Sequence, residues 1–157
     1  MQQSTFWLSP TPDVISKGWD AAIVRVCTYG LFKDKKTKQL FWVLNSHFDH
    51  VGKVARLESA KLITQKIEAL NTNNYPVILT GDFNSRPEDG PIQHITGKMQ
   101  NARNISKLVY GPADTWNGFK FNEKLNGTID YIFVSENKKI NVKKFATITD
   151  SYDLKYP

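Results

Sequence analysis

The sequence of 157 residues has very little cysteine and histidine: one cysteine, Cys27, and three histidines. A single cysteine excludes a disulfide framework within the chain. Cys27 stands inside an apolar run rich in β-branched residues, so we expect it to be buried rather than to act as a nucleophile. Only His94 lies outside the segment 47–50, which leaves too few imidazoles for a zinc site built from several histidines.

Long hydrophobic runs are also absent. No apolar stretch approaches the roughly 20 residues that a membrane-spanning helix requires. The segment from Met1 to Pro12 lacks the basic start and apolar run of a secretory signal, and the sequence assigns no localisation. The content of 40% hydrophobic and 23% charged residues is typical of a globular protein, without repeats or low-complexity segments. We therefore expect one domain over residues 1–157.

Positive charge is in excess, with a formal net charge of +6. Much of the excess lies in two clusters, Lys33–Lys38 and Lys138–Lys144. A basic surface suits a phosphorylated or polyanionic ligand, but lysines at a sheet edge also discourage aggregation. One alternative is therefore a non-enzymatic nucleic-acid-binding module, with Trp19, Trp42 or Trp116 as stacking surfaces.

Hydrophobic periodicity predicts β-strands with helical cover. Arg56, Leu57, Ala60, Ile63, Ile67 and Leu70 share one face of a helix over about 53–70. We expect residues 1–20 to form a loop, because Pro10, Pro12 and Gly18 interrupt polar sequence. Alternating or apolar β-branched runs predict strands at 22–32, 40–46, 76–80, 128–134 and 142–148, the first two as a hairpin. This order shows no clean βαβ alternation, so a doubly wound sheet is not expected.

The segment Gly-Asp-Phe-Asn at 81–84 places two polar side chains after a predicted strand. Residues i and i+2 of an extended chain point the same way, so Asp82 and Asn84 would face one site and Phe83 the core. A carboxylate can hold a hard cation or orient water, and an amide can donate to a phosphate oxygen. The same residue types also form ordinary turns, so both interpretations stay open.

Two further polar segments accompany strands. His47 follows an apolar strand and could donate to a phosphoryl oxygen, or be satisfied by nearby backbone. We expect Asp49 to cap the following helix, with a calcium-like ligand as the alternative, and His50 to shape the loop. Asp130 stands in an apolar strand and needs a partner, such as a histidine, a metal, an arginine or a backbone donor.

Together, these segments resemble the endonuclease/exonuclease/phosphatase superfamily. The resemblance is carried by Asn-Ser-His-Phe-Asp-His at 45–50, Ala-Arg at 55–56, Gly-Asp-Phe-Asn-Ser at 81–85 and Ile-Asp-Tyr-Ile at 129–132, in that order. Phe-Trp-Leu-Ser at 6–9 and Gly-Trp-Asp-Ala-Ala at 18–22 are similar to its bacterial branch. Each motif alone is weak, but their order makes the resemblance strong. It implies an α+β fold, a two-sheet β-sandwich flanked by helices (DNase I-like), and hydrolysis of phosphate esters with Mg²⁺, or Mn²⁺ in its place.

The resemblance also implies roles for single residues. Asp82 would orient or activate the attacking water, Asn84 would hold phosphate or metal, and both would be metal ligands. His47 would stabilise charge on the phosphoryl oxygens, and Asp130 would orient a second histidine. Arg56, Ser85 and Trp116 are the substrate-cleft candidates. The expected partners are a phosphate-ester substrate, with nucleic acid among the candidates, and a monomer is expected when the protein is complete.

The chain departs from the family pattern at both ends. The strands carrying an asparagine and the main metal-binding glutamate have no counterpart, and the Ser-Asp-His segment would be expected next after Tyr156-Pro157. We therefore expect a C-terminal portion of the domain that is inactive alone. Two other enzyme classes fit less well. Asn45 occupies the first histidine position of a metallo-β-lactamase-like motif, and a calcineurin-like Gly-Asn-His is missing.

Overall fold

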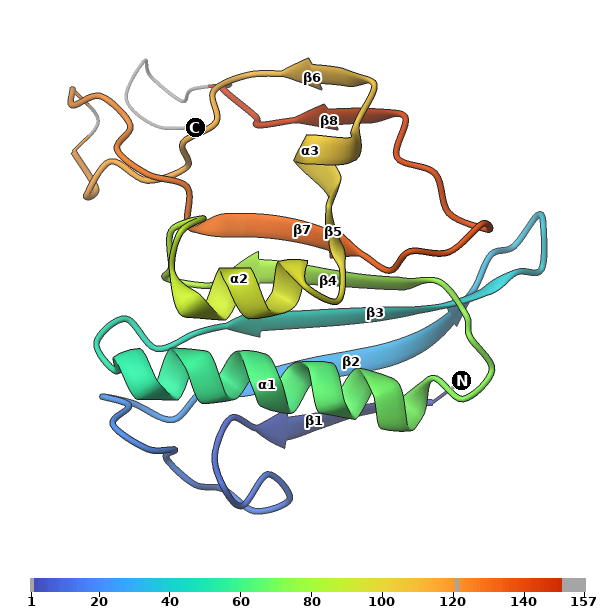
Figure 1. Ribbon diagram of the computed structural model, residues 1–157, viewed down its shortest axis with the longest axis horizontal. Coiled ribbons are helices and arrows are strands. Elements are labelled where there is room, and N and C mark those ends of the chain that lie inside the picture. Colours follow the sequence, from blue (N-terminus) through green and yellow to red (C-terminus); the bar gives the residue numbers. More distant parts are fainter. Residues whose placement is uncertain (1, 121, 151–157) are drawn as a thin grey trace.

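The computed structural model describes residues 2–120 and 122–150 and consists of a mixed β-sheet with helices on one face (Figure 1). Six strands follow the spatial order β1-β2-β3-β4-β7-β5. Their bounds are β1 Gln3–Trp7, β2 Val26–Lys33, β3 Leu40–His47, β4 Val77–Asp82, β7 Asp130–Val134 and β5 Gln100–Asn101. A separate two-stranded sheet pairs β6 Leu108–Tyr110 with β8 Lys144–Ala146, and the helices are α1 Lys53–Leu70, α2 Gly90–Thr96 and α3 Ala102–Ile105. The predicted α+β class is confirmed.

The centre of the sheet contains one parallel pair. Strands β2 and β3 form the predicted antiparallel hairpin, whereas β3 and β4 run parallel and are joined by α1. The predicted order of strand 40–46, helix 53–70 and strand 76–80 agrees with this βαβ unit, but the parallel pairing of its strands was not predicted. It has a direct consequence for the site, since parallel neighbours bring their carboxyl ends to the same edge of the sheet.

The prediction of a loop over residues 1–20 is wrong for Gln3–Trp7, which forms the edge strand β1. Only Phe6 of this strand is buried, and it pairs with Cys27 of β2. The first three residues of β1 are polar and exposed, so the strand lacks a strong hydrophobic signal. Cys27 itself is fully buried, as predicted, and burial raises the pKa of its thiol.

The core lies between the sheet and the helices α1 and α2. Its centre is an aromatic cluster in which Phe83 makes edge-to-face contacts with Phe48, Tyr131 and Phe133, at centroid distances of 4.8, 5.8 and 5.4 Å. Such contacts are favourable in geometry and bury large apolar surfaces. The prediction that Phe83 turns into the core is confirmed, since its side chain is fully buried.

The N-terminus of α1 is capped by a residue from a distant loop. Asp20 accepts hydrogen bonds from the backbone N–H groups of Ala55 (2.6 Å) and Val54 (3.2 Å). These bonds lower the pKa of Asp20. Gly52 occupies the N-cap position, and a side chain there would collide with Asp20. The expectation that Asp49 caps this helix is therefore wrong.

Asp49 instead ties two loops together. Its Oδ1 accepts from the N–H groups of Val51 (2.9 Å) and Gly52 (2.7 Å), and its Oδ2 accepts from Ala22 (3.0 Å) and Ile23 (3.2 Å). The side chain is buried. Burial raises the pKa of Asp49, but the four amide donors lower it by more and hold it well below the usual range. The loop that follows His47 is therefore anchored to the loop that precedes β2.

Helices long and apolar enough to cross a membrane do not occur within the described ranges.

Candidate functional site

Three strands place the predicted polar residues in one row. His47 ends β3, Asp82 ends β4 and Asp130 begins β7. The register pairs His47 with Asp82, and Asp82 with Asp130. Residues paired across neighbouring strands project to the same face of a sheet. His47 Nε2 lies 3.4 Å from Asp82 Oδ2, so the histidine and the first carboxylate are in direct contact.

Gly81 permits the close approach of β4 to β3 beside this row. Its φ of +149° is a backbone conformation that residues with side chains rarely adopt. A Cβ atom at this position would lie 1.8 Å from the carbonyl oxygen of Ser46, its partner on β3. The glycine before Asp82 is therefore required by the packing of the two strands.

Asn84 turns the chain back toward the site. It has a positive φ of +45°, and its backbone N–H donates to Asp82 Oδ1 at 2.8 Å. Its side-chain Nδ2 donates to the carbonyl oxygen of Phe48 at 3.0 Å. The segment 81–84 is a tight turn, and it also brings Asp82 and Asn84 to one cleft. Both interpretations of the sequence, an ordinary turn and two side chains that face one site, therefore apply to this segment.

The two carboxylates of the row influence each other. Partial desolvation raises the pKa of Asp130, and the carboxylate of Asp82 raises it further, whereas the Thr115 hydroxyl and His47 oppose the rise. The Thr115 hydroxyl also accepts from the N–H groups of Ile129 (3.1 Å) and Asp130 (3.2 Å). Negative charge is thus concentrated at this point, which favours the binding of a cation.

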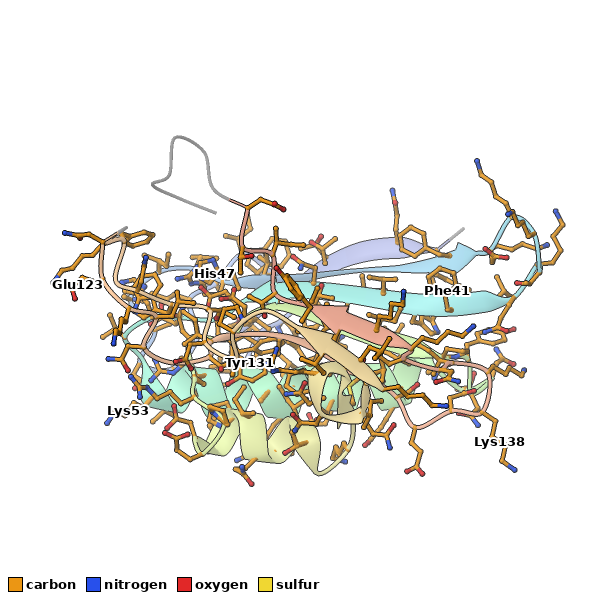
Figure 2. The ribbon with its side chains drawn as sticks, turned by 90° about the horizontal axis from the view of Figure 1, so that it is seen from above. Phe41, His47, Lys53, Glu123, Tyr131 and Lys138 are labelled. Carbon is orange, nitrogen blue, oxygen red and sulfur yellow. The ribbon has the colours of Figure 1, made fainter. Side chains whose placement is uncertain are left out.

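An open cleft of about 830 Å³ lies over His47, Asp82 and Asn84. Trp116, which was proposed as a cleft residue, is one of the residues that line it. The other residues of its lining are Arg25, His50, Arg86, Asp89, Phe119, Asn126 and Ile129. Figure 2 shows His47 at the same end of the sheet as the loop that carries Glu123. The cleft therefore has strand ends on one side and Trp116, Phe119 and Asn126 on the other.

Two predicted cleft residues lie elsewhere. The guanidinium of Arg56 donates to the carbonyl oxygen of Asp49 at 3.1 Å and supports the loop after β3. Ser85 is buried and does not line the cleft, and the Tyr131 hydroxyl donates to its carbonyl oxygen at 2.9 Å. Both residues thus lie outside the cleft lining and support the loops that form the cleft. The chain end at Tyr156-Pro157, which bears on the expected histidine partner of Asp130, lies outside the described residues.

Arg25 is a cleft residue that the sequence argument missed. Its side chain is only 13% exposed, its Nε lies 3.9 Å from Asp49 Oδ2, and its Nη2 lies 3.3 Å from His50 Nδ1. A lone arginine between apolar residues 21–24 and 26–27 was the available signal. The pairing with Asp49 brings a permanent positive charge to the wall of the cleft beside His50.

The donor set of the row suits a hard cation. Among residues 2–120 and 122–150, no three His, Cys, Asp or Glu side chains gather as a ready-made metal site. Mg²⁺, however, is usually held by only one or two carboxylates and keeps several waters. Asp82 is paired with Asp130, with which it lines an adjoining pocket, and Asn84 lines the cleft with Asp82, so their side chains offer oxygen ligands of this kind. These residues therefore fit Mg²⁺ or Mn²⁺ and could hold it.

The excess positive charge lies far from the cleft. The segments 33–38 and 136–144 contain eight exposed lysines and two acidic residues, a net charge equal to the +6 of the whole chain. They meet where Gln39 Nε2 donates to the carbonyl oxygen of Lys139 at 3.1 Å. Figure 2 shows Lys138 and His47 at opposite ends of the sheet, and the seven steps along β3 span about 23 Å. Of the tryptophans proposed for stacking, Trp42 is buried in the core, which contradicts that use.

Comparisons with known proteins agree with this architecture. The profile of the Endonuclease/Exonuclease/phosphatase family matches residues 5–144. The structure of the Bacteroides thetaiotaomicron mannosyl-6-phosphatase Bt3783 is similar, with a TM-score of 0.90 and 40% identity over 96% of this chain and 57% of that chain. A family protein from Bacteroides vulgatus gives a TM-score of 0.89 and 34% identity over 98% of this chain and 60% of its own.

A similar sequence also occurs in a virus. The uncharacterized protein L388 of Acanthamoeba polyphaga mimivirus is 35% identical over 82 residues, which cover 50% of this chain and 30% of that protein. The chain thus spans less than two thirds of the length of each of these three relatives. The similar solved structures have the DNase I-like fold that the sequence motifs predicted.

Proposed function

The chain belongs to the Endonuclease/Exonuclease/phosphatase family, and on that premise we propose that it hydrolyses a phosphate ester with a divalent cation in the cleft over His47, Asp82 and Asn84. The observation that carries the proposal is the row across β3, β4 and β7, which joins a histidine to two carboxylates at strand ends. A row of this kind supplies a base, a hydrogen-bond donor and cation ligands within one site.

Asp82 is the residue to accept a proton from the attacking water. In the reaction, the water oxygen forms a bond to phosphorus, the bond from phosphorus to the leaving alcohol oxygen breaks, and the proton from water ends on that alcohol. Asp82 is held by the N–H of Asn84 at one oxygen and by His47 near the other. These contacts orient its carboxylate toward the cleft before substrate binds.

His47 is the residue to stabilise negative charge on the phosphoryl oxygens. Its side chain is 55% exposed and projects into the cleft, while its Nε2 stays within 3.4 Å of Asp82. A donor placed where charge develops lowers the barrier. Arg25, beside His50 in the same wall, adds a fixed positive charge.

Asp130 and Asn84 complete the cation site. The Asn84 amide is oriented by its bond to the Phe48 carbonyl oxygen, and the raised pKa of Asp130 reflects partial desolvation and the negative charge of Asp82. A bound Mg²⁺ or Mn²⁺ would neutralise charge on the phosphoryl group and on the leaving oxygen. Binding of the cation would also relieve the repulsion between Asp82 and Asp130.

The charge distribution favours a small phosphorylated substrate over a polynucleotide. Among the arginine and carboxylate side chains that line the cleft, Arg25 and Arg86 are matched by Asp82 and Asp89. The lysine clusters lie at the other end of the sheet. They therefore cannot contact the phosphates of a nucleic-acid strand where it passes through the cleft. The similar Bacteroides protein is named a phosphatase that acts on a mannosyl 6-phosphate, which supports a phosphatase activity for this chain. A nucleic-acid-binding module remains the alternative.

The test is release of inorganic phosphate from small phosphate esters, measured with Mg²⁺ and with a chelator on this chain and on the chain extended to the length of its relatives. We expect turnover only in the extended chain with the cation, and a loss of more than about 100-fold in its kcat for Asp82→Asn. Asp34→Asn is the matched control, because Asp34 lies in the β2–β3 turn at the far end. Phosphate release that Asp82→Asn leaves unchanged would refute the role of Asp82. Tight, salt-sensitive DNA binding without any turnover would favour the binding module.

A further inference from the structure

We propose that the cleft selects phosphate esters whose alcohol is a sugar or a similar polyhydroxylated ring, held against Trp116 and Phe119. This inference rests on the proposed function and concerns the part of the substrate that leaves. It assigns a recognition role to Trp116, Phe119 and Asn126, which line the cleft opposite the strand ends.

Trp116 and Phe119 form an apolar corner in a cleft that is otherwise polar. Their ring centroids are 4.7 Å apart, and the ring planes are nearly perpendicular at 79°. Both rings line the cleft, and Phe119 is 80% exposed. The two rings form a contiguous apolar surface rimmed by polar groups of the cleft, and exposed surfaces of this kind mark binding sites.

The corner is held in a defined position. The N–H groups of Thr115 and Trp116 both donate to the carbonyl oxygen of Gly127, at 3.0 and 3.1 Å, and the N–H of Asn126 donates to the carbonyl oxygen of Trp116. These bonds close the neck of the segment. Arg86 then reaches across from the loop after β4 and donates to Asn126 at its carbonyl oxygen (3.4 Å) and its Oδ1 (3.3 Å). The wall is therefore preorganised on two loops.

Polar groups suited to hydroxyls surround the corner. Arg86, Asp89 and Asn126 line the same cleft and supply a guanidinium, a carboxylate and an amide. Each sugar hydroxyl both donates and accepts, so its recognition requires donors and acceptors side by side. The C–H face of a sugar ring is apolar and packs on an aromatic face. The combination of an apolar corner with mixed polar groups therefore matches a polyhydroxylated ring.

The orientation of the substrate follows from the connection to the catalytic row. Thr115 precedes Trp116, and its hydroxyl accepts from the N–H groups of Ile129 and Asp130 at the start of β7. The aromatic corner thus follows directly in sequence after Thr115, whose hydroxyl accepts the hydrogen bond from the backbone N–H of Asp130. His47, Asp82 and the corner line one cleft, so a phosphoryl group over His47 and Asp82 can place its alcohol against the corner.

A nucleobase is the competing occupant, because bases also stack on aromatic rings. The perpendicular rings form an inner corner rather than two parallel plates, so a flat base cannot be sandwiched between them. Asp89, which precedes α2, also lines the cleft, and its carboxylate would repel additional phosphates of a nucleotide chain. These features favour the sugar.

The experiment compares three esters that all release a primary alcohol: a hexose 6-phosphate, ethyl phosphate and a nucleoside 5′-monophosphate. The proteins are the wild type, Trp116→Ala, Trp116→Phe and the control Phe32→Ala, an exposed aromatic outside the cleft. We expect Trp116→Ala to lower kcat/KM for the hexose phosphate about tenfold, the effect of uncovering about 50 Å² of apolar ligand surface. Ethyl phosphate should change less than about twofold, and Trp116→Phe should recover part of the loss.

The outcomes separate this inference from the proposed function. An equal loss for all three esters, or a larger loss for the nucleotide, would overturn the sugar assignment while leaving hydrolysis intact. If no ester is hydrolysed, the proposed function fails, and calorimetric binding to the Asp82→Asn protein decides the inference. If the hexose 6-phosphate binds more tightly than inorganic phosphate, and the double variant that also carries Trp116→Ala loses this difference, the inference is supported. Equal affinities would overturn the inference.

Discussion

Replacing Asp49 with alanine should destabilise the protein severely, although the residue does no chemistry in the proposed reaction. Its buried carboxylate is the acceptor for four backbone N–H groups, two from the segment 22–23 and two from 51–52. An unpartnered buried donor costs about 1–3 kcal/mol. Because water can enter the space that the carboxylate leaves, we expect a total loss of roughly 3–5 kcal/mol rather than the full sum. That is a large part of the stability of about 5–15 kcal/mol typical of one domain.

Urea denaturation followed by circular dichroism measures this loss. Asp34→Ala is the matched control, since Asp34 also accepts from two backbone N–H groups, of Lys36 and Thr37, but in an exposed turn. The control should shift the midpoint far less. If Asp49→Ala fails to fold, Asp49→Asn provides the measurement, because the amide keeps one acceptor oxygen. An Asp49→Ala protein that loses less than about 1 kcal/mol at an unchanged m-value would refute the assignment of the carboxylate as a structural anchor.

The pH dependence gives a second check on Asp49. Burial raises the pKa of its carboxyl, but the four amide donors outweigh burial, so the folded pKa lies below the unfolded value of about 3.9. A lowered folded pKa contributes stability that is present above the unfolded pKa and is lost as pH falls toward the folded one. The difference in stability between wild type and Asp49→Asn should therefore be constant near pH 7 and shrink below about pH 4.

Three further predictions concern the row and its surroundings. Partial desolvation and Asp82 raise the pKa of Asp130, so the charged form of this residue opposes folding. Asp130→Asn should therefore raise the Tm of the cation-free protein by ~1–3 °C at pH 7, and this gain should vanish below about pH 4. A lower Tm at pH 7 would contradict this prediction. Gly81→Ala should cost more than about 3 kcal/mol, or prevent folding, because its Cβ would strike Ser46, and a fully stable variant would contradict the strand contact. Cys27 should react with a thiol reagent only at the rate of unfolding, because burial both shields its thiol and raises the thiol pKa; immediate labelling in native buffer would contradict its position in the core.

Local periodicity predicted the elements that depend on local sequence. The helix α1 occupies Lys53–Leu70 as expected, since its apolar residues recur at helical spacing and Ala55, Ala60 and Ile63 are buried. Its cap was assigned to the wrong residue, because Asp20 lies more than thirty positions upstream and no local pattern connects it to the helix. Strand β1 was missed for a related reason, since an exposed edge strand needs little hydrophobic sequence.

The placement of the predicted site residues agreed with the structure better than the expected pairing of the strands did. The i, i+2 spacing placed Asp82 and Asn84 at one cleft and Phe83 in the core, and the structure has this arrangement. The register that aligns His47, Asp82 and Asp130 depends on β3 and β4 running parallel, which the sequence did not indicate. The far wall was identified only through Trp116, because the segment 115–127 has no periodicity and its partner Arg86 lies in another loop.

The separation of charge along the sheet has a practical consequence for handling the molecule. With its excess lysines at one end and a balanced cleft at the other, the protein has a permanent electric dipole along β3. A negatively charged bead or chromatographic resin should therefore adsorb it by the hairpin end, with the mouth of the cleft facing the liquid. Protein immobilised in this way should bind small ligands as well as the free protein does, whereas coupling through random surface amines should block part of the sites.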